Sequence, residues 1–198
     1  MDTLFKPGED YVTFRERARG LMQMHPGEID MLERCLGDGK SYLELGAGFS
    51  TVFFAAKVER MVSVETRDAW WESVQSCLNR FKLDHVDLRL APPEPIAYDA
   101  LGRETWYQRS DYGTAEEFSG YLSVVRALVE KGDFDTVLVD GNVRCEVVLM
   151  LREMNFSGRT LIHDVMPSRQ HLNALALSNP RIRVREQADT LCELVWQD

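Results

Sequence analysis

The chain has 198 residues, a length at which one domain with one hydrophobic core is typical. Its 23 Lys and Arg face 32 Asp and Glu, which gives a formal net charge of −9. A negative surplus opposes binding to phosphate backbones and anionic lipids, so we expect neither a nucleic-acid partner nor a membrane partner. Apolar runs such as 52–56 are far shorter than the roughly 20 residues of a membrane helix.

The four cysteines are scattered, without a Cys-x-x-Cys pair or a Cys/His spacing typical of a zinc site. Since no apolar secretion signal opens the sequence, we expect reduced thiols in a cytoplasmic protein; they are Cys35, Cys77, Cys145 and Cys192. No repeat or linker divides the chain, so we expect a single domain over 1–198 that carries an N-terminal extension over 1–25. A homo-oligomer is compatible with these features.

The chain alternates predicted helices with β-branched runs that predict strands. Up to residue 90 the elements are a helix over 26–36, a strand over 42–45, a helix from Ser50 or Thr51 to 57, a strand over 61–65, a helix over 67–81 and a strand over 86–90. Pro26 favours the start of the first helix, and Gly37 favours its end.

The segment 91–117 interrupts this alternation. It is rich in proline, glycine and aromatic residues, and connections of this length in a compact domain are usually functional. We expect a substrate lid here, with Trp106 and Tyr107 contacting the substrate. The alternative is a surface insertion without a role in binding.

Beyond residue 117 the predicted elements are a helix over 118–131, a strand over 136–140, a helix over 143–154, a strand over 160–162, a helix over 167–178 and strands over 181–185 and 191–196. The last two strands flank the polar stretch "EQAD", a pattern typical of an antiparallel hairpin. The sequence therefore predicts an α/β, Rossmann-like fold. Its seven-stranded, mostly parallel sheet would carry helices on both faces and a C-terminal antiparallel hairpin.

The stretch "SYLELGAGFST" at 41–51 places a glycine turn between a strand and a helix. Such a turn lets a ligand approach the backbone, and the N–H groups of the helix start favour electron-rich groups. Glu65 ends the next strand, 19 residues after Gly46, where a carboxylate can accept hydrogen bonds from ribose hydroxyls. A nucleoside derivative is the predicted ligand.

Two features oppose a nicotinamide dinucleotide. Its fingerprint needs a third glycine where Thr51 stands, and a pyrophosphate gains nothing from Glu44 inside the first strand. S-adenosylmethionine carries a sulfonium and an ammonium and no phosphate, so it suits both features. A nicotinamide oxidoreductase is the weaker alternative.

"LELGAGFST" resembles motif I of the class I S-adenosylmethionine-dependent methyltransferases, and "VSVE" resembles the acidic end of their second strand. The resemblance implies that Glu44, Gly46, Ala47 and Gly48 lie along the methionine half of the cofactor and that Glu65 holds the ribose. Ser50 stands in place of the third glycine of the family motif, in the same cofactor loop.

"FDTVLVDGNVRCEVVLML" and "SGRTLIHDV" resemble the fourth and fifth strands of the small-molecule members of that family. Asp140, His163 and Asp164 follow these strands, at the edge where open α/β sheets bind ligands. His163 could be a general base, since its ordinary pKa is near ~6.5. Alternatively, Asp140 and Asp164 could bind Mg²⁺, as the resemblance to the catechol O-methyltransferase arrangement suggests, although Val165 stands where that arrangement has Asn. A purely structural role is the third option.

Arg144 follows Asp140 closely and either binds an acidic acceptor or pairs with Asp140. The sequence as a whole predicts methyl transfer from S-adenosylmethionine to a small molecule, at oxygen. The alternative is a catalytically inactive protein that binds S-adenosylmethionine or S-adenosylhomocysteine.

Overall fold

The computed structural model describes residues 6, 8–37, 40–94 and 113–197. Trp106, Tyr107 and most of the expected lid over 91–117 lie outside the described residues, so their roles stay predictions.

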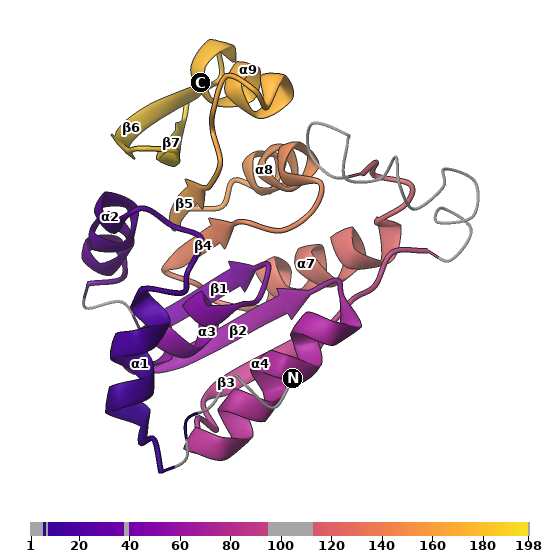
Figure 1. The fold of residues 1–198 in the computed structure, drawn as a ribbon. Helices are drawn as coiled ribbons and strands as arrows, with labels where there is room; N and C mark the ends of the chain where they lie inside the picture. The colour runs from indigo at the N-terminus through magenta and orange to yellow at the C-terminus, as the bar shows by residue number, and fades with distance from the viewer. Residues whose placement is uncertain (1–5, 7, 38–39, 95–112, 198) are drawn as a thin grey trace.

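One seven-stranded sheet organises the chain, with the strand order β3-β2-β1-β4-β5-β7-β6 (Figure 1). The strands are β1 (Ser41–Leu45), β2 (Arg60–Glu65), β3 (Val86–Leu90), β4 (Thr136–Val139), β5 (Arg159–Ile162), β6 (Ile182–Ala188) and β7 (Leu191–Trp196). β1 to β5 pair in parallel, whereas β7 pairs antiparallel with both β5 and β6. The predicted fold class is therefore confirmed, including its closing hairpin.

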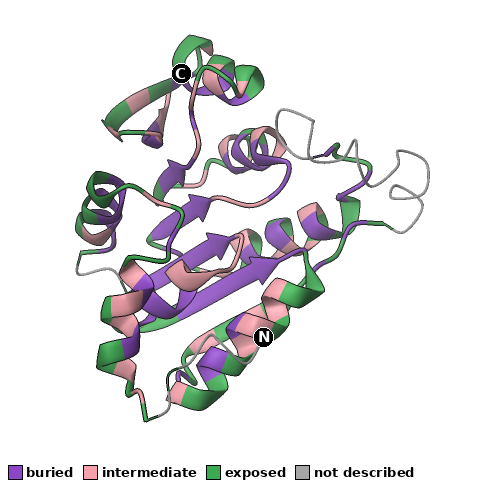
Figure 2. Cartoon of the chain, in the orientation of Figure 1, coloured by how far each residue is buried: buried purple, intermediate pink, exposed green. Residues whose placement is uncertain are grey.

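Helices cover both faces of the sheet and bury two apolar layers. The helices are α1 (Tyr11–Arg19), α2 (Pro26–Leu36), α3 (Phe49–Phe54) with the 3₁₀ turn η1 (Ala55–Lys57), α4 (Asp68–Phe81), α7 (Ser119–Lys131), α8 (Arg144–Glu153) and α9 (Gln170–Ser178). One layer holds side chains of α7, α8 and α9, and the other holds side chains of α1 to α4. The central strands are buried and the outer helix faces are exposed (Figure 2). This double cover explains why the central strands read as continuous apolar runs.

Helix α1 is absent from the sequence prediction, which treated 1–25 as an extension. Asp10 caps the helix by accepting a hydrogen bond from the Thr13 N–H at 2.8 Å. Phe14 and Ala18 are fully buried, so the segment packs as part of the domain. Smaller differences are that α9 begins at Gln170 rather than at 167, and that the helix predicted to end at 57 tightens into η1. Strand β6 continues to Ala188 instead of ending at 185, so most of the polar stretch predicted to separate the hairpin strands belongs to β6.

All four cysteines are free thiols, as expected. Among the described residues, no helix combines the length and the apolar character needed to cross a membrane.

Candidate active site

A cleft of about 500 Å³ opens at the carboxyl ends of the parallel strands. It is lined by the turn after β1, the end of β2, the loops after β4 and β5, and the segment between α1 and α2. After β1 the chain builds β2 and β3 on one side, and then β4 and β5 on the other. The cleft thus lies at the point where the strand order reverses, which is the usual ligand position in open α/β sheets.

Gly46 shapes the turn after β1. Its φ is +105°, and a Cβ there would lie 2.8 Å from the Asp140 carbonyl oxygen and 2.9 Å from the Gly141 nitrogen. The absence of a side chain lets the turn lie directly against the loop after β4. Gly48, two residues later, has an extended φ of −174° and no such neighbours.

Gly46→Ala is therefore expected to lower the free energy of unfolding by about 1–3 kcal/mol, because the new methyl group meets backbone atoms and φ is strained. Gly48→Ala is the matched control, with an expected change below about 1 kcal/mol, since a Cβ there meets only Ser50 Oγ at 3.8 Å. Urea unfolding of both variants checks this, and equal losses would contradict it.

Glu44 lies behind the turn and not along the cleft. The side chain is fully buried and accepts hydrogen bonds from the hydroxyl groups of Thr51 and Ser63. Burial raises the pKa of Glu44 to about 7. Thr51 in turn accepts the Gly48 N–H at 2.9 Å. Thr51, which stands where a dinucleotide fingerprint has glycine, thus links Glu44 to the turn.

Glu65 ends β2 and faces the cleft. Its Oε2 accepts the Ala47 N–H at 2.9 Å, and its Oε1 accepts the Thr66 and Arg67 N–H groups, both at 2.9 Å. Burial raises the pKa of this carboxyl group. Because a carboxylate offers about four acceptor positions, capacity is left on Oε2 for a ligand hydroxyl group.

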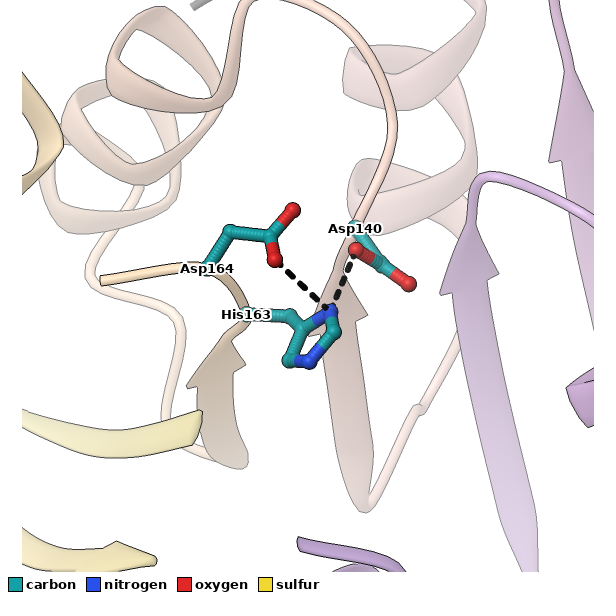
Figure 3. A group of neighbouring side chains, drawn as sticks. All are labelled: Asp140, His163 and Asp164. Atoms are coloured by element: carbon teal, nitrogen blue, oxygen red, sulfur yellow. Dashed lines mark hydrogen bonds and ion pairs between the residues drawn. The ribbon is translucent and has the colours of Figure 1, made fainter. Parts of the chain in front are cut away.

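His163 lies between two carboxylates at the carboxyl end of β5. Its Nδ1 is 2.9 Å from Asp140 Oδ1, and its Nε2 is 3.1 Å from Glu28 Oε2. Figure 3 shows that one ring nitrogen of His163, Nδ1, faces both Asp140 and Asp164; Asp164 Oδ1 is 3.8 Å from it. Burial acts to lower the pKa of His163, but the negative charges and hydrogen bonds of Asp140 and Glu28 outweigh it and raise the pKa to about 10.

This environment opposes the general-base interpretation of His163. An imidazole with a pKa of about 10 is protonated at neutral pH, and both of its nitrogens donate to carboxylates. The geometry favours a positioning role, in which the imidazolium holds Asp140 at the cleft.

Glu28 is the partner that the sequence did not reveal. It is fully buried in the first turn of α2, and its Oε1 accepts the N–H and the hydroxyl group of Thr190 at 2.7 and 2.6 Å. Burial would raise the pKa of Glu28, but the hydrogen bonds from His163 and Thr190 outweigh it and lower the pKa to about 2. An acid three positions into a helix reads as a capping residue, and Glu28 does accept the His25 N–H, so the sequence carried no further signal.

The raised pKa of His163 predicts a pH dependence of stability. Its contribution is fully present below its ordinary value of 6.5 and is lost as the pH rises from there through about 10. The melting temperature is expected to fall over this range, and more shallowly in His163→Asn. His171→Asn, at an exposed position of α9, is the control and should keep the wild-type slope. A His163→Asn profile parallel to that of the wild type would contradict the assignment.

Arg144 is the first residue of α8 and forms the ion pair with Asp140 that the sequence allowed, with Nη2 3.1 Å from Asp140 Oδ1. Its Nη1 also donates to Asp164 Oδ2 at 2.9 Å, and Arg169 Nη2 is 3.0 Å from the same oxygen. The preceding residue, Val143, is left-handed with φ 45°, a conformation that costs a β-branched residue about 1–3 kcal/mol. The turn aims Arg144 back at the strand ends.

The guanidinium groups of Arg144 and Arg169 affect whether Asp140 and Asp164 can bind Mg²⁺. Asp140, His163 and Asp164 offer ligand atoms within 4.8 Å of one another, as a metal site would. However, both carboxylates already pair with guanidinium groups, which neutralise their charge. A Mg²⁺ ion would have to share these carboxylates with two cations that are already in place, so the residues present do not fit it.

The opposite wall of the cleft is apolar. Met22 and Met24, from the segment between α1 and α2, face it together with Phe49 and Trp70. The Phe49 and Trp70 rings pack edge to face, with centroids 6.3 Å apart. No pattern around these methionines in the sequence points to a ligand, so this wall was not predicted. Of the expected cofactor residues, the cleft is lined by Gly46, Ala47, Gly48, Ser50 and Glu65.

No protein-family model matches the sequence, and no curated protein matches it. Solved structures are similar in fold. A methyltransferase-like protein from Silicibacter pomeroyi aligns with a TM-score of 0.65 and 21% identity over 88% of each chain. The O-methyltransferase TomG from Streptomyces achromogenes, in complex with S-adenosylmethionine, has a TM-score of 0.59 and 15% identity over 100% of this chain and 93% of its own. An O-methyltransferase from Bacillus cereus, in complex with S-adenosylhomocysteine, has a TM-score of 0.57 and 16% identity over 94% and 89%. The chain thus has the fold of these methyltransferases.

Proposed function

We propose that this protein transfers the methyl group of S-adenosylmethionine to a small-molecule acceptor, at oxygen. The observation that carries the proposal is the combination of the glycine turn at Gly46 with the Glu65 carboxylate in one cleft at the switch point of the sheet. Two proteins of the same fold were crystallised with this cofactor or its product, which supports the same ligand here.

In this proposal the cofactor lies along Gly46, Ala47, Gly48 and Ser50, with its ribose at Glu65. The free acceptor capacity of the Glu65 carboxylate supports a hydrogen bond from a ribose hydroxyl group. When bound, the cofactor supplies an activated methyl group.

The acceptor would lie between the apolar wall and the charged group of Asp140, His163 and Asp164. Methyl transfer is an in-line displacement, so alignment of the acceptor can supply much of the acceleration. His163 and Asp164 then act as positioning residues. The side chains of Asp140 and Asp164 are 24% and 20% exposed, whereas Glu28 is fully buried. Burial acts to raise the pKa of Asp140, but the neighbouring Arg144 and His163 outweigh it and lower the pKa. Asp140 is therefore a weak base. This favours an acceptor whose hydroxyl group ionises readily.

A small-molecule acceptor is also supported by the net charge of −9, which opposes a polyanionic substrate. A cytoplasmic location stays a prediction.

Calorimetric titration with S-adenosylmethionine, S-adenosylhomocysteine and NAD tests the cofactor. We expect binding of the first two and none of the third, because the turn lacks the pyrophosphate fingerprint. Binding of NAD alone, or of none of the three, would overturn the proposal. A panel of hydroxylated acceptors with methyl-labelled cofactor then identifies the substrate.

A further inference from the structure

Arg144 is buried at the carboxyl ends of β4 and β5, with 4% of its surface exposed. Its Nε donates to Gly141 O at 2.9 Å, its Nη1 to His163 O at 2.6 Å, and its Nη2 to Asp140 O at 3.0 Å. In addition, Nη2 forms an ion pair with Asp140 Oδ1, and Nη1 donates a hydrogen bond to Asp164 Oδ2. These contacts engage all three nitrogens of the guanidinium group, so Arg144 is committed to groups of the protein itself.

The local chain does not favour an arginine at this position for its own sake. Arg144 begins α8, where the helix dipole disfavours a cation. The turn that aims it requires the left-handed conformation of Val143. The position of Arg144 thus runs against two local preferences, and its contacts with the strand ends and with the two carboxylates offset that cost.

We propose that Arg144 is the built-in cation of this site, standing where a divalent metal ion would have to lie between Asp140 and Asp164. The guanidinium group bridges one oxygen of each carboxylate, as a shared metal ion would. The site therefore binds no divalent ion, and Asp140 and Asp164 are held in place without one.

The surrounding charges agree with this arrangement. The three carboxylates of Asp140, Asp164 and Glu28 share the site with the two guanidinium groups of Arg144 and Arg169. A divalent ion added to this group would leave an excess of buried positive charge, which is costly in a poorly solvated site. Removal of Arg144 would instead leave the Asp140 and Asp164 carboxylates without their shared cation, and their oxygens could then hold a hard cation.

Titration with Mn²⁺, followed by electron paramagnetic resonance of the free ion, tests the proposal without cofactor or substrate, so its outcome is independent of the proposed function. The wild-type protein and Asp164→Asn are expected to give the same titration curve. Wild-type binding that disappears in Asp164→Asn would overturn the proposal. This comparison decides the question even if variants of Arg144 do not fold.

Arg144→Ala provides the second arm, with circular dichroism as the check on folding. We expect the dissociation constant of this variant for Mn²⁺ to be at least roughly tenfold lower than that of the wild type. The reason is that the substitution removes the guanidinium group that pairs with both carboxylates. The gain should disappear in the double variant Arg144→Ala/Asp164→Asn. Arg126→Ala, which removes an exposed arginine paired with Glu153 at 3.5 Å, is the matched control and should gain nothing. A folded Arg144→Ala protein that binds no more Mn²⁺ than this control would contradict the proposal.

Discussion

Glu28→Ala is expected to lower the free energy of unfolding by about 3–5 kcal/mol, the largest loss that we predict for one side chain. Glu28 is fully buried and is the acceptor for His163 Nε2 and for both donors of Thr190. Its removal leaves these donors without a partner in a site that is closed to water, and it leaves the imidazolium with less negative charge around it. Urea unfolding, monitored by circular dichroism, measures the loss.

Asp30→Ala is the matched control for this experiment. Asp30 lies on the same helix, α2, but its side chain is 55% exposed and it pairs with the partly exposed Arg19. We expect this variant to lose less than about 1 kcal/mol, because surface ion pairs contribute little. Similar losses in the two variants would show that Glu28 contributes no more than a surface pair.

Glu65→Ala is expected to raise the dissociation constant for S-adenosylmethionine roughly 10- to 100-fold, or about 1.5–3 kcal/mol. The variant removes the proposed acceptor for the ribose. It also frees the Ala47, Thr66 and Arg67 N–H groups, which fix the edge of the cleft. Calorimetric titration gives the constant, and the melting temperature shows how far the fold itself is affected.

Glu72→Ala removes an exposed carboxylate of α4 and is the control for overall charge. It should bind the cofactor as the wild type does. An unchanged affinity in Glu65→Ala would refute the assignment of Glu65 to the ribose, and a parallel loss in both variants would point to long-range electrostatics.

The fold was predictable because its strands carry local signals. Parallel strands with helices on both faces must be apolar on both sides, and the alternation of the last two runs indicates an antiparallel hairpin, although β6 extends through Ala188. Helix α1 escaped prediction because charged residues surround its two buried positions, Phe14 and Ala18. Its burial is settled by packing against distant parts of the chain, which no local pattern records.

The site was predictable where strand ends determine it. Asp140, His163 and Asp164 follow adjacent parallel strands, and they lie together as expected. What the sequence left open depends on partners: the pKa of His163 is raised by Asp140 together with Glu28, which is 135 residues away. The choice between the two roles of Arg144 depends on the backbone carbonyl groups that surround it. Neither the contact of His163 with Glu28 nor the contacts of Arg144 with the carbonyl groups can be recognised from a spacing of residues in the sequence.

The contacts of Glu28 also determine how the protein can open. Thr190, in the turn between β6 and β7, donates its N–H to a carboxylate 162 residues earlier in the chain. The turn of a terminal hairpin would ordinarily exchange its amide hydrogens through local fraying. Because the acceptor of this amide belongs to α2, we expect the amide of Thr190 to exchange more slowly than a freely fraying turn, at a rate that reports how often α2 and the hairpin separate.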